Sequence, residues 1–448
     1  MRTCESEGVD PVIDPTNERH VASALLVAAQ VGDIILTAGT ANRDVETSMR
    51  RTVAGFGLSR VHIDVTLNTI TLSAMVPDGA GRTPVTIVRV VTARQQNFSQ
   101  LAQVGRLVRS IEAGVTTPAA ALEALEDLER ARPPRGIGWE LFGWGLLDGS
   151  FALYLGGSWI AAVVSFLAGV VIMAVYRLVE RLGLGAFFAL VLGGLLAAVP
   201  GILAYVVAPS VRPSLIIASS IVVLVAGLTL VQALQDGIMG AVVTASGRFF
   251  EALLHTSAII AGVSLGIKLG TVIGITLPTL ETLTTTPDVR AATFTVLIGG
   301  VAAAGYALAC YAEPIPIAIT LVTTWIALGV YYTIALFTTF GYVTATAVAA
   351  TLIGGVGGLL SRRFLIPPLI IAISCSTPLL PGLAIYRSIY ALLNAQITTG
   401  FTNMALAIAI AVALAAGLVL GEWVAQRLRR PSRLFPPVAV RVRSTRTG

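Results

Sequence analysis

A short sequence segment, here called the phrase, occurs twice and decides how this chain folds. PSLIIASS runs from Pro213 to Ser220 and PPLIIAIS from Pro367 to Ser374, and six of the eight positions are identical at an offset of 154 residues. After a one-residue slip, apolar residues also recur at equivalent places in 227–240 and 382–395. The longer match favours an internal duplication. Chance remains the alternative, because 55% of the chain is hydrophobic.

The composition places most of the chain in lipid. Its mean hydropathy is +0.83 and only 12% of its 448 residues are charged, whereas roughly a quarter are charged in soluble proteins. Charge is also unevenly distributed, with 14 Arg against 16 acids in residues 1–140 and 16 basic residues against 8 acids in 141–448. The two parts therefore belong to different environments. No apolar run follows a basic start, so we expect no cleaved signal peptide.

Ten apolar segments are close to the ~20 residues that a membrane span requires. The expected spans are 141–157, 159–176, 185–208, 213–231, 251–277, 292–311, 315–338, 341–360, 365–391 and 400–424. This count puts the loops with Arg177 and Arg181, Arg248, and Arg362 and Arg363 on the same side as the Arg-rich tail. By the positive-inside rule that side is the cytoplasm. Both termini are therefore expected inside.

The direction of the two phrases follows from this count. The first opens the fourth span and the second opens the ninth, so they run through the membrane in opposite senses. A duplicated unit of five spans must invert, and inverted repeats are typical of secondary transporters. The expected fold is an α-helical polytopic membrane protein of ten transmembrane helices in two inverted five-helix repeats, preceded by a small α+β cytoplasmic domain. The expected boundaries are 1–17 for a disordered leader, 18–136 for the α+β domain, 137–290 and 291–426 for the repeats, and 427–448 for a basic cytoplasmic tail.

The first domain alternates between two periodicities. Helical spacing predicts helices at 18–37, 43–56, 98–113 and 118–131, and a period of two predicts strands at 60–68, 69–76 and 84–93. His62 and Asp64 share one strand face, where a solvated surface is a better interpretation than a metal or acid–base pair. Motifs for phosphate binding, nucleophilic catalysis or zinc hydrolysis are lacking. The three cysteines have no disulfide or metal spacing. We therefore expect a regulatory or assembly role, no enzyme activity, no metal and no cofactor.

The ninth span contains SCSTPLLPGLAIYRS, which predicts a broken helix. Proline lacks a backbone donor, so Pro378 and Pro381 with Gly382 leave polar groups free at membrane depth. A half-helix starting near Gly382 would direct its positive N-terminus at the membrane centre, which suits a carboxylate. Hydroxyls stand beside it, at Ser374, Ser376 and Thr377. A kink that serves packing alone is the alternative.

Two charged residues within spans are further candidates. Asp148 is a lone acid in the first span and is costly there without a partner or a task. It could carry a proton or contact a substrate ammonium, unless the span begins later and Asp148 lies in the interface. Lys268 is the only lysine in the chain. It could hold a carboxylate or pair with Asp148, although it is close enough to the outer end to reach the surface.

Polar residues at equivalent places in the two copies complete the candidate set. Arg387 in span nine corresponds to Gln232 in the first copy. Glu251 and His255, four residues apart on one helix face, are weaker candidates for proton relay. The cytoplasmic edge of span five explains this pair equally well.

The chain as a whole resembles a known family. The pattern VASALLVAAQVGDIILTAGTANRDVETSMRR, then VHIDVTLNTITLS, five spans, and a second five-span unit with PLLPGLAIYRSIYALLN is similar to the threonine/serine exporter family of bacteria, over about 18–424. The resemblance implies export of L-threonine and L-serine across the inner (plasma) membrane of a bacterium, driven by the proton-motive force, with the first domain in the cytoplasm.

Other readings stay open. Export of a C4 dicarboxylate such as succinate is one alternative, because similar halves occur as two separate proteins associated with that activity. Lys268 and Arg387 would then anchor the substrate. A membrane-tethered enzyme or sensor is a different class. The expected partners are the substrate, protons and anionic lipid at the basic tail, without nucleic acid, and a homo-oligomer is compatible with the sequence.

Overall fold

The computed structural model describes residues 13–78, 81–91, 96–131, 135–209, 211–222, 224, 226–275, 289–363, 367–393 and 396–428. Most of the expected leader (1–17) and almost all of the basic tail (427–448) lie outside the described residues, as does most of the loop 277–290. Their predicted properties therefore stay predictions.

The first part of the chain, residues 13–130, is an α+β region. It contains α1 (Glu18–Thr37), α2 (Asn42–Gly55), β1 (Val61–Thr66), β2 (Thr69–Asp78), β3 (Gly81–Val90), α3 (Phe98–Glu112) and α4 (Pro118–Arg130). The strands form one antiparallel sheet in the order β1-β2-β3, with Val61 opposite Ala74 and Thr69 opposite Val90. The predicted helices and strands are confirmed within a few residues. His62 and Asp64 are exposed on β1, in agreement with a solvated face.

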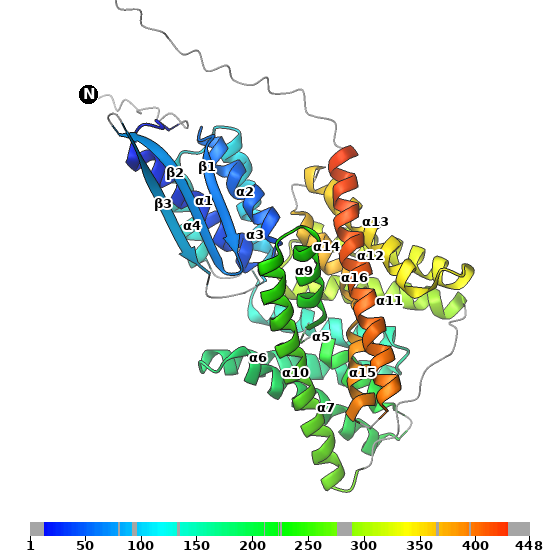
Figure 1. Cartoon of the computed structure of the whole chain (residues 1–448). Coiled ribbons are helices and arrows are strands. Elements are labelled where there is room, and N and C mark those ends of the chain that lie inside the picture. Colours follow the sequence, from blue (N-terminus) through cyan, green and yellow to red (C-terminus); the bar gives the residue numbers. More distant parts are fainter. Residues whose placement is uncertain are drawn as a thin grey trace, which may run out of the picture.

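Helix α1 has the length and apolar character of a membrane span, yet it packs against the sheet. An 18-residue stretch within it has a mean hydropathy of 1.6, and two-thirds of that stretch is buried inside the protein. Asn17 caps its first turn by accepting from the backbone N–H of Arg19 at 3.0 Å. Gly39 follows with φ of +85°, which favours glycine and turns the chain towards α2. The α+β region lies beside the adjoining ends of α9 and α10 (Figure 1).

The rest of the described chain is helical. Its elements are α5 (Ile137–Tyr154), α6 (Trp159–Arg181), α7 (Ala186–Val207), α8 (Pro213–Val222), α9 (Ala226–Ile238), α10 (Val242–Val272), α11 (Val289–Ala309), α12 (Pro314–Phe337), α13 (Gly341–Arg363), α14 (Pro368–Ser376), α15 (Gly382–Leu393) and α16 (Ile397–Leu428). Within the described part, nine helical segments are long and apolar enough to cross a membrane. That number includes α1 and counts α14–α15 as one segment, but includes neither α5 nor α8 and α9.

Two of the expected spans are interrupted. In the second copy of the phrase, α14 ends at Ser376, a 3₁₀ turn follows over Thr377–Leu379, and α15 begins at Gly382, so the predicted break is confirmed. The expected span 213–231 likewise consists of two helices, because α8 ends at Val222 and α9 begins at Ala226. Leu224 lies between them and is buried, and a Cβ atom added at Gly193 of α7 would lie 2.8 Å from its Cδ2. Packing of Leu224 on α7 stabilises this break.

In each half of the helical part, one close pair is formed by helices at the same positions in the order of spans. In the first half α7 packs on α10, and a Cβ atom added at Gly262 would lie 2.0 Å from the carbonyl oxygen of Val191. In the second half α13 packs on α16, and a Cβ atom added at Gly421 would lie 2.1 Å from the carbonyl oxygen of Thr351. Only glycine allows backbones to approach so closely. The third and fifth expected spans of each half therefore form a tight pair.

Candidate functional site

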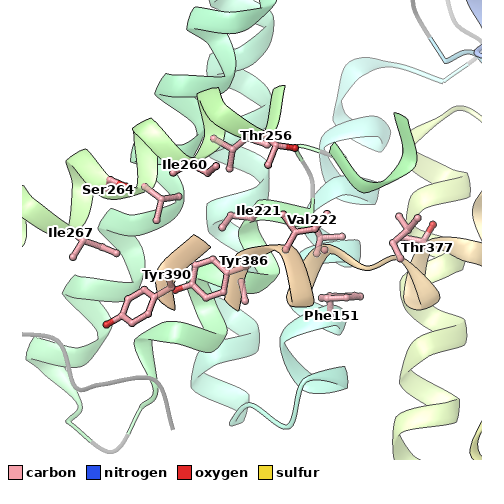
Figure 2. Close-up of a pocket in the computed structure, with 16 residues that line it drawn as sticks. Phe151, Ile221, Val222, Thr256, Ile260, Ser264, Ile267, Thr377, Tyr386 and Tyr390 are labelled. Carbon is pink, nitrogen blue, oxygen red and sulfur yellow. The ribbon is translucent and has the colours of Figure 1, made fainter. Parts of the chain in front are cut away.

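A small cavity of about 60 Å³ lies where the two interrupted helices come together. Ile221 and Val222 line it from the last turn of α8, and Gly382 and Tyr386 line it from the first turns of α15. Figure 2 shows the side chains of Ile221, Val222 and Tyr386 with those of α10 and with Phe151 of α5 around the same space. The cavity therefore lies between the helix break in the first copy of the phrase and the helix break in the second copy.

Hydroxyl groups and one helix terminus provide the polar character of this cavity. Thr256, Ser264, Thr377, Tyr386 and Tyr390 line it, and none of the lining side chains that the structure describes is charged. The Ser264 hydroxyl has no hydrogen-bond partner among the described residues. The N-terminal turn of α15 has free backbone donors and carries about half a positive charge. A carboxylate and a hydroxyl are the groups that this cavity can bind.

Open space lies in front of the α15 N-terminus. A Cβ atom added at Gly382 would meet no atom within 4 Å. The chain immediately before it is extended at Leu380, with ψ of 142°, so the helix does not continue through the break. The prediction of a half-helix at Gly382 is thus confirmed in its geometry, while its role in binding stays a prediction.

The predicted serines of α14 do not line the cavity. Ser374 and Ser376 are fully buried, and Ser376 donates to the carbonyl oxygen of Ile373 at 2.8 Å. The Ser374 hydroxyl has no partner among the described residues, and the same holds for Ser220. Ser220 is the last residue of the first phrase and so corresponds to Ser374. The sequence analysis missed Ser220, although the repeat pointed to it.

Asp148 is buried in the middle of α5. It is 0% exposed, and neither carboxylate oxygen has a hydrogen-bond partner in the described part of the chain. A Cβ atom added at Gly169 of α6 would lie 2.6 Å from Asp148 Oδ2, so the carboxylate fits against a position that only glycine leaves open. Phe151, one turn further along α5, lines the cavity. Both interpretations of Asp148, at membrane depth or in the membrane interface, stay predictions.

The two basic candidates lie apart from the cavity. Lys268 is exposed on α10, and the expected pair with Asp148 is wrong because that carboxylate has no described partner. Arg387 is half-buried on α15 but is not among the described residues that line the cavity. Gln232, its counterpart, donates from Nε2 to the carbonyl oxygen of Gly39 at 3.0 Å. Gln232 therefore contacts the α+β region.

A second, larger cavity of about 820 Å³, here called the vestibule, lies between the α+β region and the helices. It is lined by Gly39, Leu67 and Gln96 of the α+β region and by Glu140, Arg177, Gln232, Glu251, His255 and Tyr311. Glu251 and His255 are thus brought together as predicted, but in the vestibule. Arg177, which the sequence analysis treated only as a loop charge, lies in α6.

Three residues of the vestibule form a polar cluster that the sequence analysis did not find. Glu140 is 5% exposed, accepts a hydrogen bond from the Tyr311 hydroxyl and forms an ion pair with Arg177. Arg177 Nη2 also donates to the Tyr311 hydroxyl at 3.2 Å. Burial, together with the Glu140 carboxylate, raises the pKa of Tyr311 to about 12, so this hydroxyl keeps its proton. The cluster fixes the adjoining ends of α5, α6 and α11.

These observations define the class of protein. Long apolar helices, two of them interrupted beside a buried cavity, make a polytopic helical membrane protein with the broken helices found in secondary transporters. Residues 26–270 match the ThrE family model, described as "Putative threonine/serine exporter", and residues 284–424 match a second model described as "Threonine/Serine exporter, ThrE". The chain belongs to the threonine/serine exporter family.

Two curated relatives match over nearly the whole of this chain. The chain is 46% identical over 429 residues to the "Threonine/serine exporter" of Corynebacterium glutamicum, which covers 95% of this chain and 87% of the relative. It is 32% identical over 438 residues to the "Probable threonine/serine exporter" of Mycobacterium tuberculosis, covering 96% of this chain and 80% of the relative. No solved structure matches the chain.

Proposed function

We propose that this protein exports L-threonine and L-serine from the cytoplasm in exchange for protons, through the cavity between the two helix breaks. The observation that carries this proposal is the free N-terminus of α15 at Gly382, which opens on a cavity with hydroxyl groups. The substrate carboxylate binds the helix terminus, and its hydroxyl binds Ser264 or Thr377. The membership of the chain in the exporter family supports the same substrates.

The charge of the cavity favours a zwitterion over a dicarboxylate. A dicarboxylate brings two negative charges, whereas one helix terminus offers only about half a positive charge. The described lining has no cationic side chain, Lys268 is exposed, and Arg387 lies outside the lining. An amino acid carries its own ammonium group. It therefore requires no cation from the protein beyond the α15 terminus.

Asp148 is the proposed proton carrier. An ionisable group at membrane depth is costly and marks a functional site by default, and Asp148 is fully buried with no described partner. Phe151, one turn further along α5, lines the cavity, which supports this role. Protonation removes its charge, and the exchange of that proton for substrate couples export to the proton gradient. Glu251 and His255 line the path from the cytoplasm.

The proposed architecture is two inverted repeats of five spans, residues 137–290 and 291–426. The interrupted helices in both copies of the phrase and the glycine-mediated pairs α7–α10 and α13–α16 support it. The distribution of Arg supports a bacterial inner membrane, with both termini and the α+β domain (18–136) in the cytoplasm. The basic tail would then lie on anionic lipid. A transporter fits the family better than a membrane-tethered enzyme or sensor.

Reconstituted protein tests this function. Proteoliposomes containing the full chain are loaded with labelled threonine, serine or succinate, and efflux is measured with and without a pH gradient. We expect gradient-driven efflux of threonine and serine but not of succinate. Asp148→Asn should abolish the effect of the gradient, and the control Lys268→Gln should leave it unchanged. Efflux of succinate alone, with dependence on Lys268, would show the proposal to be wrong.

A further inference from the structure

Two turns of the α+β region meet at one hydroxyl of α10. The Thr244 hydroxyl accepts from Asn42 Nδ2 at 2.7 Å and from the backbone N–H of Leu67 at 3.1 Å. Asn42 Nδ2 also donates to the carbonyl oxygen of Val65 at 2.8 Å. Leu67 has φ of +53°, which is unusual for a residue with a side chain. Its side chain packs where a Cβ atom at Gly247 would lie only 2.7 Å away.

A buried ion pair lies beside this contact. Arg248 of α10 and Asp236 of α9 are each about 1% exposed, and Arg248 Nη1 lies 2.6 Å from Asp236 Oδ2. Both residues also contact the α1–α2 turn. The backbone N–H of Asn42 donates to Asp236 Oδ1 at 3.2 Å, and Arg248 Nη2 donates to the carbonyl oxygen of Thr40 at 3.1 Å. The α+β region is thus joined to the α9–α10 hairpin by buried polar bonds.

A separate contact joins the α+β region to the turn between α11 and α12. The backbone N–H of Phe98 donates to the carbonyl oxygen of Cys310 at 2.8 Å. The Phe98 ring lies against that of Tyr306, with centroids 6.2 Å apart. Arg106 Nη2 forms an ion pair with Glu313 Oε1 at 2.8 Å. This second contact holds the end of α11.

The two contacts lie on either side of the vestibule. Leu67, from the first contact, and Gln96, next to the second, both line it. The α+β region therefore bridges the start of α10 and the end of α11 across the vestibule. A movement of either helix end changes the width of this space, unless the bridge keeps them at a fixed separation.

We propose that the α+β region is a strut that sets the width of the vestibule, and that Asn42 and Thr244 are positioning residues for the loading of substrate from the cytoplasm. This inference rests on the proposed export of threonine and serine. Neither residue is among those that line the 60 Å³ cavity. Loss of their bond should therefore weaken the apparent affinity for cytoplasmic substrate while leaving the maximal rate intact.

The test compares three threonine variants in proteoliposomes, with threonine supplied on the side of the α+β region. Thr244→Val keeps the shape but removes the acceptor of two buried donors, and we expect KM to rise about three- to tenfold with the maximal rate within about twofold. Thr244→Ser retains the hydroxyl and should restore KM. Thr333→Val on α12 is the matched control, because among the described residues the exposed Thr333 hydroxyl bonds within its own helix, to the carbonyl oxygen of Gly329.

A second measurement reports on the strut itself. Spin labels at Phe249→Cys and Ile315→Cys, both exposed sites near the two contacts, give the distance between them. We expect Thr244→Val to broaden this distance distribution and Thr244→Ser to leave it narrow. An unchanged distribution, an unchanged KM, or a fall in maximal rate at constant KM overturns the inference. Failure of the unmodified protein to move threonine would instead overturn the proposed function.

Discussion

The buried ion pair between Asp236 and Arg248 gives the most quantitative prediction. Asp236→Asn keeps the shape of the side chain but removes the charge that lies 2.6 Å from the Arg248 guanidinium. At an effective dielectric constant of ~20, two unit charges at that distance attract by about 6 kcal/mol. Desolvation of both groups offsets much of this attraction. Breaking one side of a buried pair costs about 3–5 kcal/mol.

Hydrogen exchange of the α1–α2 turn measures this cost. A loss of 3 kcal/mol corresponds to more than about a hundredfold in the equilibrium between docked and undocked states. Because the pair holds the carbonyl oxygen of Thr40 and the N–H of Asn42, protection of residues 39–45 should fall by a similar factor. The paired change Asp236→Leu with Arg248→Met should recover most of it, since apolar replacement of a whole buried pair is often neutral or stabilising.

An exposed pair provides the control. Glu46 and Arg50 on α2 lie 2.6 Å apart, with 41% and 56% of their side chains exposed. Glu46→Gln should cost no more than about 1 kcal/mol. If Asp236→Asn changes protection no more than Glu46→Gln does, the buried pair does not hold the two parts together, and the reasoning is refuted.

Two further predictions concern the helix break and the response to pH. Pro381→Ala with Gly382→Ala should make α14–α15 more continuous, because alanine favours helix by about 3 kcal/mol over proline and about 1 kcal/mol over glycine; the melting temperature in detergent should not fall, but threonine efflux per folded molecule should be lost. A packing kink predicts lower stability with unchanged efflux per folded molecule. Burial, with the neighbouring Glu422 carboxylate, raises the pKa of Asp44 to about 7, so its contribution to stability is complete below pH ~4 and declines as the pH rises towards 7. Asp44→Asn should reduce the difference between melting temperatures at pH 5 and pH 8, and an unaltered difference would contradict this assignment.

The two helix breaks differ in how far the sequence could predict them. Pro378, Pro381 and Gly382 interrupt a helix by their own chemistry, because proline has no N–H and glycine disfavours helix. The break between Val222 and Ala226 has no proline, and it depends on packing of Leu224 against α7. Contacts between distant segments do not appear in local propensity. Only the repeat pointed to this second break.

At the candidate site, too, the sequence did not reveal contacts between distant segments. A lone acid in an apolar segment is visible in the sequence, so Asp148 could be named, but its fit against Gly169 could not. Asp236 and Arg248 are likewise visible in the sequence, because they are the charged residues of the apolar stretch 213–250. The sequence analysis used only Arg248, and only to orient the spans. Their pairing depends on the turn between α9 and α10, where Gly240 has φ of +92°. Docking of Asn42 on Thr244 had no signal along the chain.

The apolar character of α1 has a consequence for how the chain is made. An 18-residue stretch of this helix has the hydropathy of a membrane span, and α1 precedes the other described helices in the chain. A membrane-insertion machinery that reads hydropathy alone would accept it, which would reverse the topology of everything that follows. Its partners β2 and β3 end only at Val90, so the nascent chain must expose α1 until about 50 more residues have emerged. Productive biosynthesis therefore depends on α1 joining its sheet before the translocon captures it.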